Sequence, residues 1–510
     1  MVERLAQRTA GGMLWMASGF AVQIVLQLVT LGILARLIPP RAFGVVGAAL
    51  IAVSAAQILA ESGLGPALVQ ARDLRPEHVR VGFTLSVLLG LACFAALFVA
   101  ADAIEAFFPD IDGLAPVLRL VSLVFLIRNL TVGDFLLLRS LRFQTLAGIE
   151  VLSYALGYGV VAIAMALTGY GVWAIAWGQV GQQAVRTTAV WIVRPHPIRP
   201  QLKVQPAREL LGYGGGHTLA KAANWLARQG DNFVVGRFLG AAALGLYTRA
   251  YQLMTMPAQL FGKAADDVLF PSMAAVQDDI VRLSRAYLRS VTVIALLALP
   301  VSAVAATLSR EVILVLLGDD WLELKPAFDI MVFGILFRTS YKLSDSLVRA
   351  LGAVYRRAWR QGVYAALVIV GAVIGQQWGI AGVAWAVLVA VVANFLLMAS
   401  LSLRLLSSTW RAFAAAHTPG LLLAVVMAAV SWPLGALARS QDLPSLVTLV
   451  VGCAGAVVVG LLLVRTAPFL RPLTALAATV GYLTAVLPDR GGRLARQVLG
   501  RGYAHPVPPP

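Results

Sequence analysis

Stretches of about 20 mostly apolar residues recur along almost the whole of this 510-residue chain. A helix needs about 20 such residues to cross a bilayer, and a spanning segment must satisfy its backbone polar groups internally. The sequence therefore predicts an all-α polytopic membrane protein with 14 transmembrane helices. We place them near residues 12–35, 42–64, 81–101, 114–137, 148–167, 171–193, 213–236, 244–265, 288–308, 326–348, 361–376, 379–402, 417–438 and 444–464.

The composition excludes a soluble protein. Hydrophobic residues make up 59% of the chain and charged residues 13%, whereas soluble proteins carry roughly 25% charged residues. The formal net charge of +17 does not indicate nucleic acid, because the basic residues gather in short loops, where they act as topology signals. No nucleic-acid-binding motif occurs, and we expect no nucleic-acid partner.

The distribution of basic residues predicts that both termini lie in the cytoplasm. Cytoplasmic loops of membrane proteins are enriched in Lys and Arg. With this orientation most loop cations fall inside, including those of a basic tail over 466–510. The loop cations left on the outer side are Arg36, Arg41, Arg237, Arg310, Lys325 and Arg439.

Weak internal repetition predicts two related halves. Phe43-Gly44 matches Leu244-Gly245 at an offset of 201 residues, and two further short matches have offsets of 210 and 208. An even number of spans per half makes this a parallel repeat. We expect two pseudo-symmetric six-helix lobes, an N-lobe at 1–193 and a C-lobe at 213–405, joined by a cytoplasmic connector at 194–212. Two extra helices follow at 413–465.

Charged residues inside the predicted spans are the strongest functional signal. A charge near the bilayer centre costs at least ~2.5–3.5 kcal/mol, so it should face a protein interior or a watery cavity. Because guanidinium and ammonium groups match phosphate oxygens, we hypothesise a diphosphate site. Its candidate residues are Arg128, Lys221, Arg228, Arg338 and Lys342. The alternative is that these cations are structural and pair with Asp231, Asp345, Asp134 or Glu61.

Several other polar residues within the spans have two interpretations each. Asp231, Asp345 and Glu61 are either ion-pair partners or sites that couple transport to H⁺ or Na⁺. Arg186 and Arg249 lie near predicted span ends, where they either line a cavity rim or extend toward the membrane surface. Gln23, Gln27 and Thr30 share one helix face, which suits either a sugar path or close helix packing.

The sequence does not indicate an enzyme. None of the five His residues stands at metal-ligand spacing from a Cys or carboxylate, so we expect no metal site. The glycine-rich run Gly212–Gly216 lacks the pattern of a nucleotide-binding loop. We therefore expect no cofactor other than a coupling ion.

Four motifs carry a family resemblance. They are Gln229–Tyr247 (QGDNFVVGRFLGAAALGLY), continued by Arg249, Tyr251 and Pro257; Ala35–Gly44 (ARLIPPRAFG); Glu61–Gly65 (ESGLG); and Leu269–Met273 (LFPSM). With these motifs the chain resembles the polysaccharide-exporter branch of the multidrug/oligosaccharidyl-lipid/polysaccharide flippase superfamily, in particular colanic-acid-type exporters. The resemblance covers roughly residues 5–405.

The resemblance implies a flippase in the bacterial inner membrane. Its substrate would be an undecaprenyl-diphosphate-linked oligosaccharide, carried by alternating access through a cationic cavity. Membrane lipids and a polysaccharide polymerase with its co-polymerase would be partners. The alternatives are a multidrug/cation antiporter of the same superfamily, which needs acidic residues in its cavity, and a flippase for the peptidoglycan precursor. A membrane-embedded glycosyltransferase would need catalytic carboxylates that we do not find.

Overall fold

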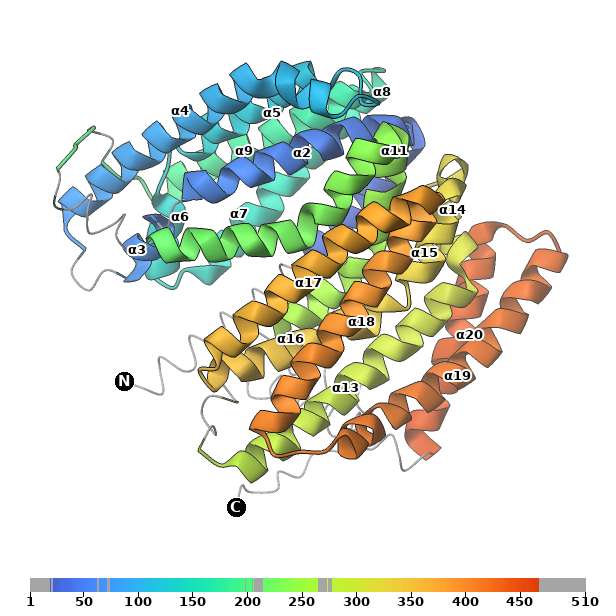
Figure 1. Ribbon diagram of the computed structural model, residues 1–510. Helices are drawn as coiled ribbons and strands as arrows, with labels where there is room; N and C mark the ends of the chain where they lie inside the picture. The colour runs from blue at the N-terminus through green and yellow to red at the C-terminus, as the bar shows by residue number, and fades with distance from the viewer. Residues whose placement is uncertain are drawn as a thin grey trace, which may run out of the picture. The chain divides into compact units, whose positions relative to one another are not determined.

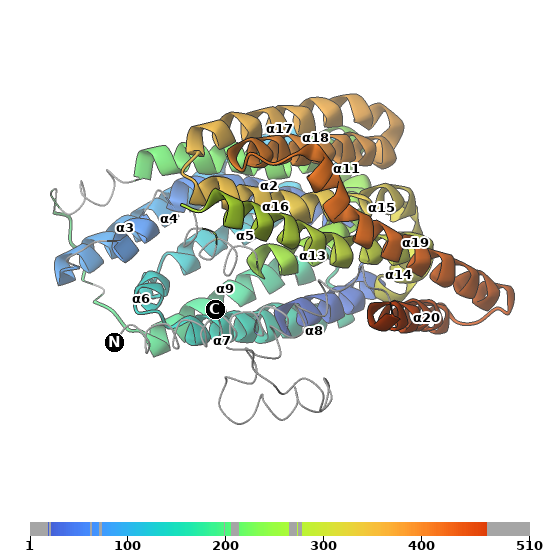
Figure 2. The ribbon, with the colours of Figure 1, turned by 90° about the horizontal axis from the view of Figure 1, so that it is seen from below.

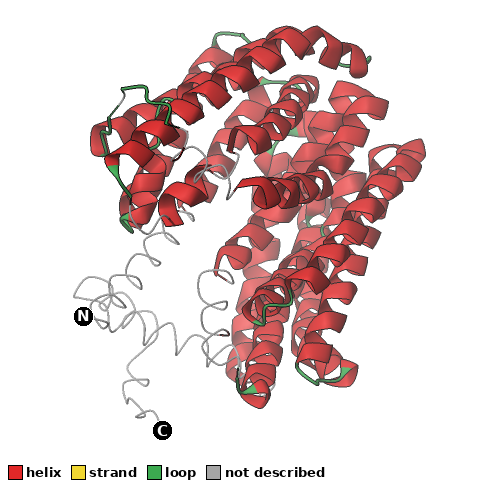
Figure 3. Ribbon diagram, turned by 60° about the vertical axis from the view of Figure 1, so that its left-hand side comes forward, coloured by secondary structure: helices red, strands yellow, loops and turns green. Residues whose placement is uncertain are grey.

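The described part of the protein is entirely helical. This computed structural model describes residues 22–61, 64–70, 74–197, 199–203, 214–264 and 278–466, together with Gly19, Gln205 and Met273. Within these ranges every regular element is a helix and no strand occurs (Figure 3). The prediction of an all-α chain is therefore confirmed for the part of the sequence that is described.

The chain divides into two compact units. The first comprises Met1–Pro271 and Ser309–Ser402, and the second comprises Ser272–Leu308 and Leu403–Pro510. The first unit begins with the helix Val22–Leu37 and continues through the elements labelled in Figure 1. These are α2 (Pro40–Glu61), α3 (Leu64–Gln70), α4 (Pro76–Phe107), α5 (Leu114–Arg128), α6 (Gly133–Arg139), α7 (Phe143–Leu152), η1 (Ser153–Val160), α8 (Val161–Leu167), α9 (Val172–Val193), α11 (Gly214–Ala264), α14 (Ser309–Leu316), η3 (Asp319–Leu324), α15 (Lys325–Met331), α16 (Gly334–Ala350), α17 (Val354–Gly375), η4 (Gln376–Trp378) and α18 (Gly379–Leu405).

The protein is a multi-pass membrane protein. Seven helices of the described chain are long and apolar enough to cross a bilayer, and the bent pair formed by α5 and α6 makes an eighth if it is one span. The apolar stretch Tyr355–Leu405 has 51 residues, far more than one span needs. The stretch is this long because it contains two helices that pack against each other at Gly375 and Gly382. A Cβ on Gly375 would lie 2.5 Å from the Gly382 carbonyl oxygen, so α17 and α18 form a hairpin. The total of 14 spans stays a prediction.

The long element α11 also folds back on itself. Sixteen residues of continuous helix would separate two side chains by about 24 Å. Yet the Tyr247 hydroxyl donates a hydrogen bond of 2.9 Å to Asp231 Oδ2. The reversal occurs at Gly240, whose φ of 80° is readily adopted only by glycine. The reversal falls between the stretches 213–236 and 244–265, so the described parts of these two stretches lie on different segments of α11. That each segment crosses the membrane stays a prediction.

Two glycines allow α2 and α11 to cross closely, and the two elements pack together (Figures 1 and 2). A Cβ on Gly44 would overlap the carbonyl group of Ala241, and a Cβ on Gly245 would overlap that of Pro40. The same offset of 201 residues relates both pairs. Reciprocal contact of this kind is what a local two-fold axis produces. The full two-lobe arrangement stays a prediction.

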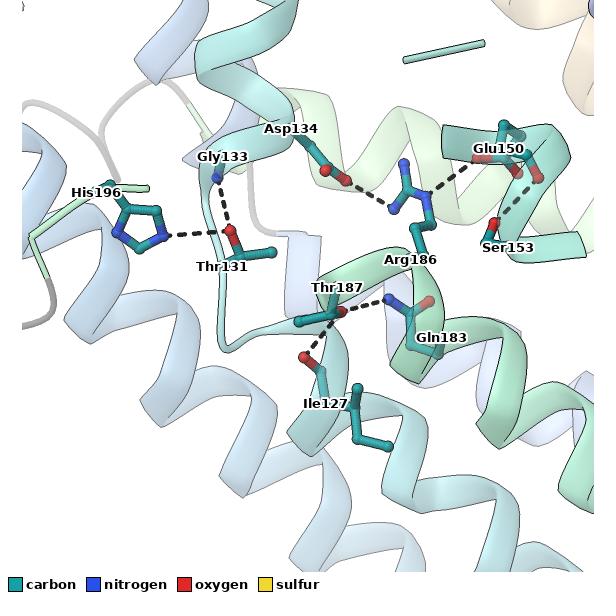
Figure 4. A network of polar contacts seen from close by, with 10 residues as sticks. All are labelled: Ile127, Thr131, Gly133, Asp134, Glu150, Ser153, Gln183, Arg186, Thr187 and His196. Carbon is teal, nitrogen blue, oxygen red and sulfur yellow. Dashed lines mark hydrogen bonds and ion pairs between the residues drawn. The ribbon is translucent and has the colours of Figure 1, made fainter. Parts of the chain in front are cut away.

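The apolar helices α5 and α6 meet at a bend of 52°. A break in a membrane helix frees backbone donors, which must find other partners. Here the Val132 N–H donates to His196 Nε2 at 3.2 Å. The Gly133 N–H donates to Thr131 Oγ1 at 3.0 Å, as Figure 4 shows. Because a backbone N–H can only donate, His196 Nε2 must be the acceptor and Nδ1 carries the proton.

The second unit contains three long helices, α13 (Ile280–Thr307), α19 (Trp410–Ser440) and α20 (Ser445–Thr466). A Cβ on Gly420 of α19 would lie 2.5 Å from the carbonyl carbon of Ala295 in α13, so only glycine permits this crossing. The hydroxyl groups of Thr307 and Ser431 lie 2.8 Å apart and join the two helices further along.

Candidate functional site

A polar cavity of about 200 Å³ lies among the helices of the first unit. Five elements form its wall: the Val22–Leu37 helix, α2, η1, α9 and α11. Most polar atoms in this wall come from three amide side chains, two phenols and one guanidinium. They belong to Gln27, Gln179, Gln252, Tyr154, Tyr158 and Arg249. Polar groups facing inward from apolar helices are expensive in a membrane protein and mark binding sites or transport paths.

Arg249 is the cationic side chain in this wall. Its guanidinium carbon lies 4.7 Å from the ring centroid of Phe43, over the ring, a cation–π contact that partly replaces water. One terminal nitrogen, Nη1, donates to Gln252 Oε1. Its Nε is buried and has no hydrogen-bond partner among the described residues. No Asp or Glu is among the described residues that line the cavity, so its positive charge is available to an anion.

A π-helix supplies the two tyrosines. Over Ser153–Val160 the chain forms π-helical turns. Such turns are rare in proteins, and those that occur often lie at functional sites. The rings of Tyr154 and Tyr158 stack with centroids 5.2 Å apart. Gly157 lets η1 approach α9, because a Cβ there would lie 2.5 Å from the Gly181 carbonyl oxygen. This close packing holds the tyrosines against the cavity.

A second polar cluster surrounds Asp231, which is 2% exposed. Its carboxylate accepts hydrogen bonds from the Tyr247 hydroxyl and from the Asn232 N–H, each of 2.9 Å, and it interacts electrostatically with Arg338. Arg338 Nη1 donates to the Tyr364 hydroxyl at 3.2 Å. The Arg338 guanidinium also lies over the ring of Tyr251, 4.9 Å from its centroid.

The cations predicted to form one diphosphate site have different surroundings. Arg228 is exposed and makes no hydrogen bond or ion pair with any residue in the described ranges, so the spacing-based pair with Asp231 does not form. Arg128 is the last residue of α5, just before the bend toward α6. Both Arg128 and Lys342 make a polar or electrostatic contact. Of the charged candidates among the described residues, only Arg249 lines the cavity.

The other candidates are mostly held by ion pairs. Arg186 contacts the carboxylates of Asp134 at 2.7 Å and Glu150 at 3.1 Å (Figure 4). Asp345 pairs with Arg349 at 3.3 Å and also with Arg357. The side chains of Lys221 and Glu61 lie outside the described residues.

Sequence reasoning found Arg249 and Gln27 but missed the rest of the cavity wall. Gln27 was recognised because it repeats with Gln23 and Thr30 on one helix face. Gln179, Gln252, Tyr154 and Tyr158 gave a weaker signal, an uncharged polar group in an otherwise apolar span. Uncharged groups lower the hydropathy of a span little, and these four residues do not share one helix face as Gln23, Gln27 and Thr30 do.

Comparison with known proteins places the chain in a family. The family model described as "Polysaccharide biosynthesis protein" matches residues 33–326. The chain belongs to this family. Its lipopolysaccharide biosynthesis relative WzxC of Escherichia coli (strain K12) is 24% identical, covering 86% of this chain and 89% of the relative. The teichuronic acid biosynthesis protein TuaB of Bacillus subtilis (strain 168) is 26% identical, covering 67% and 71%. The succinoglycan biosynthesis transport protein ExoT of Rhizobium meliloti (strain 1021) is 29% identical, covering 61% and 63%.

Solved structures with the same fold are membrane transporters. The lipid II flippase MurJ in an inward closed conformation superposes with a TM-score of 0.71 at 13% identity, covering 88% of this chain and 98% of that one. An inward-facing multidrug resistance transporter of the MATE family gives a TM-score of 0.60 at 14% identity, covering 76% and 94%. At these identities the likeness establishes the fold.

Proposed function

We propose that this polysaccharide biosynthesis protein is a flippase for undecaprenyl-diphosphate-linked oligosaccharide repeat units. It moves them across the bacterial inner membrane, where they are used to build surface or exported polysaccharide. The observation that carries the proposal is the cavity around Arg249. It is a polar site inside the helical bundle, and its described wall contains a cation and no carboxylate. Such a site suits a hydrophilic, anionic head group that crosses the membrane.

The diphosphate contacts are assigned to cations outside the Arg249 cavity. We propose Arg228 and Arg338 as the principal contacts, with Arg128, Lys221 and Lys342 as further candidates. Arg228 suits this role because it is exposed and lacks any described partner, so its positive charge serves no ion pair within the described chain. Arg338 is the weaker case structurally, since Tyr251 and Tyr364 already contact its guanidinium.

Transport is proposed to follow alternating access, driven by an H⁺ or Na⁺ gradient. Asp231 is the candidate coupling residue because its buried carboxylate has hydrogen-bond donors but no ion pair within 4 Å among the described residues. Asp345 suits this role less, since two arginines contact it. On this proposal the polymerase and its co-polymerase receive the glycan on the outer side, and both termini are cytoplasmic.

The multidrug/cation antiporter is disfavoured by the charge of the cavity. A cationic drug requires carboxylates to balance it, and the described wall contains Arg249 and no carboxylate. The peptidoglycan-precursor flippase shares the fold of MurJ and is separated from our proposal by phenotype. Its loss would cause lysis, whereas loss of a polysaccharide flippase leaves intact cells without surface polysaccharide.

The test is a deletion strain complemented with variants. We expect deletion to abolish surface polysaccharide and to accumulate a lipid-linked oligosaccharide on the inner leaflet, identified by extraction and mass spectrometry. Wild type restores export, whereas Arg228→Ala does not, although its expression is normal. The control is Arg41→Ala, which removes an exposed cation paired with Asp112 and should restore export fully. Accumulation of no lipid-linked glycan, or full export by both Arg228→Ala and Arg338→Ala, contradicts the proposal.

A further inference from the structure

The charge of the Arg249 cavity is too small for a diphosphate. Each phosphate of a diphosphate carries its own negative charge, and burying an unbalanced charge is costly. Within the described wall, Arg249 is the only charged side chain, accompanied by amide, phenol and apolar groups. One guanidinium balances one carboxylate. The cavity therefore matches a ligand group with a single negative charge.

The hydrogen-bonding state of Arg249 points to the same chemistry. Its Nη1 is engaged by Gln252, whereas its Nε is a buried donor without a described partner. Nε and Nη2 form one edge of the planar guanidinium, and two parallel N–H···O bonds from such an edge fit the two oxygens of a carboxylate. A carboxylate bound there would satisfy the Nε donor, which is costly to leave unpaired.

The rest of the wall suits a sugar ring. The amides of Gln27, Gln179 and Gln252 offer both donors and acceptors, as sugar hydroxyls require, and Tyr154 adds an aromatic surface and a hydroxyl. The volume of about 200 Å³ is below the roughly 300–1,000 Å³ of pockets that enclose a drug-sized ligand. It accommodates one ring of an oligosaccharide.

We propose that the Arg249 cavity binds a carboxylate-bearing sugar ring of the translocated glycan, with Arg249 taking the carboxylate. The proposal rests on the proposed flippase function and narrows its substrate class to acidic repeat units. The amides and tyrosines recognise the ring, and Arg249 selects for the acid. The diphosphate is then held elsewhere, by the cations assigned to it above.

The first arm of the test measures binding without transport. Purified full-length protein in detergent is heated with methyl glucuronide, methyl glucoside or inorganic pyrophosphate, each at the same concentration. We expect the glucuronide to raise the apparent melting temperature of wild type and of Arg41→Ala, but not of Arg249→Ala. Protection by pyrophosphate that Arg249→Ala abolishes would show that the anion is a diphosphate and would overturn the proposal. Equal protection by glucuronide in wild type and Arg249→Ala would overturn it as well.

The second arm measures flipping in proteoliposomes. Two undecaprenyl-diphosphate-linked trisaccharides are compared that differ only in one ring, glucuronate or glucose. We expect Arg249→Ala to slow the glucuronate form about tenfold or more, as loss of a charge-assisted hydrogen bond implies, and the glucose form less than about twofold. Arg249→Lys keeps the positive charge but loses the two parallel N–H donors of the guanidinium edge. Its rate of flipping the glucuronate form should lie between those of wild type and Arg249→Ala. The unliganded melting temperature of each variant controls for folding.

The outcomes separate the two proposals. Two results overturn the acidic-sugar proposal and leave the flippase function intact. One is equal slowing of both trisaccharides by Arg249→Ala, and the other is wild-type protein that methyl glucuronide stabilises no more than methyl glucoside. Failure of wild type to flip either trisaccharide, with glucuronide binding retained in the first arm, contradicts the flippase function instead.

Discussion

The crossing of α2 and α11 at Gly44 yields a sharp prediction. A Cβ at this position would lie 2.5 Å from the Ala241 carbonyl carbon and overlap its oxygen, whereas non-bonded carbon atoms prefer about 3.5–4.0 Å. The obstacle is backbone, so no side chain can rotate away. In Gly44→Ala the two helices must part by about 1 Å or more. Phe43 would move with α2, and the cavity that it lines would change shape.

The expected cost follows from overpacking. Inserting a methyl group into a close-packed contact costs about 1–3 kcal/mol, and loss of the tight crossing adds to it. The matched control is Gly362→Ala in α17, where a Cβ would meet no atom within 4 Å. Alanine is favoured over glycine in a helix by roughly 1 kcal/mol, so this control should be neutral or stabilising. Gly44 lies in the helix α2, so the gain from alanine applies to both variants, and they should differ by about 1–3 kcal/mol in the free energy of unfolding.

The assay is thermal unfolding in detergent, followed by the fraction of monodisperse protein, together with polysaccharide export by each variant. We expect a lower melting temperature and reduced export for Gly44→Ala and wild-type behaviour for Gly362→Ala. Gly245→Ala strains the same crossing from its other side, so adding it to Gly44→Ala should cost less than the sum of the single effects. Equal melting temperatures of Gly44→Ala and Gly362→Ala would refute the close crossing.

Two further predictions concern polar contacts. Tyr247→Phe removes a donor from the buried Asp231 carboxylate and should lower the free energy of unfolding by about 1.5–3 kcal/mol. Tyr355→Phe, at a site that is 91% exposed, should have no effect, and equal stability of the two variants would contradict the bond. Burial lowers the pKa of His196, which lies in the loop after α9. The imidazole therefore binds a proton more readily in the unfolded protein than in the folded one. Stability from the neutral ring is therefore full above about pH 6.5 and is lost as the pH falls through the lowered pKa. His196→Gln should flatten this pH dependence of the melting temperature. An unchanged pH dependence would show that His196 is not its cause.

The helical class and the family were predictable from the sequence because both depend on features that run along the chain. Apolar stretches of bilayer length predict helices wherever they occur. The motifs around Gln229–Tyr247 also lie within one continuous segment, which includes Asp231, Gly240 and Gly245. The break between α5 and α6 was harder to predict. Residues 129–132 contain the polar Asn129 and Thr131, but so few polar residues leave the stretch 114–137 apolar enough to predict one continuous span.

The partners of the charged residues were not predictable, because they depend on which segments fold together. Helical spacing placed Arg228 beside Asp231, but the reversal at Gly240 brings Tyr247 to Asp231 instead. From the sequence, the place of Arg249 near a predicted span end fitted a cavity rim and contact with the membrane surface equally well. Arg249 is half-buried because α2 and α11 cross here and place the Phe43 ring against its guanidinium. Similarly, no 3.6-residue pattern encodes the π-helix that presents Tyr154.

Arg249 shows how an apolar bundle can hold a cation that is neutralised by no carboxylate of the described chain. The negative face of the Phe43 ring and the side-chain amide oxygen of Gln252 each supply partial negative charge to the guanidinium, and together they offset part of the desolvation cost. Both partners are neutral, so the net positive charge of the site is preserved. A carboxylate in place of Gln252 would stabilise Arg249 more, but it would cancel the attraction for an anion. A site for anionic ligands must keep its positive charge available to the ligand. Arg249 meets this requirement because an amide and an aromatic ring contact it in place of an acid, although an acid would bind the guanidinium more strongly.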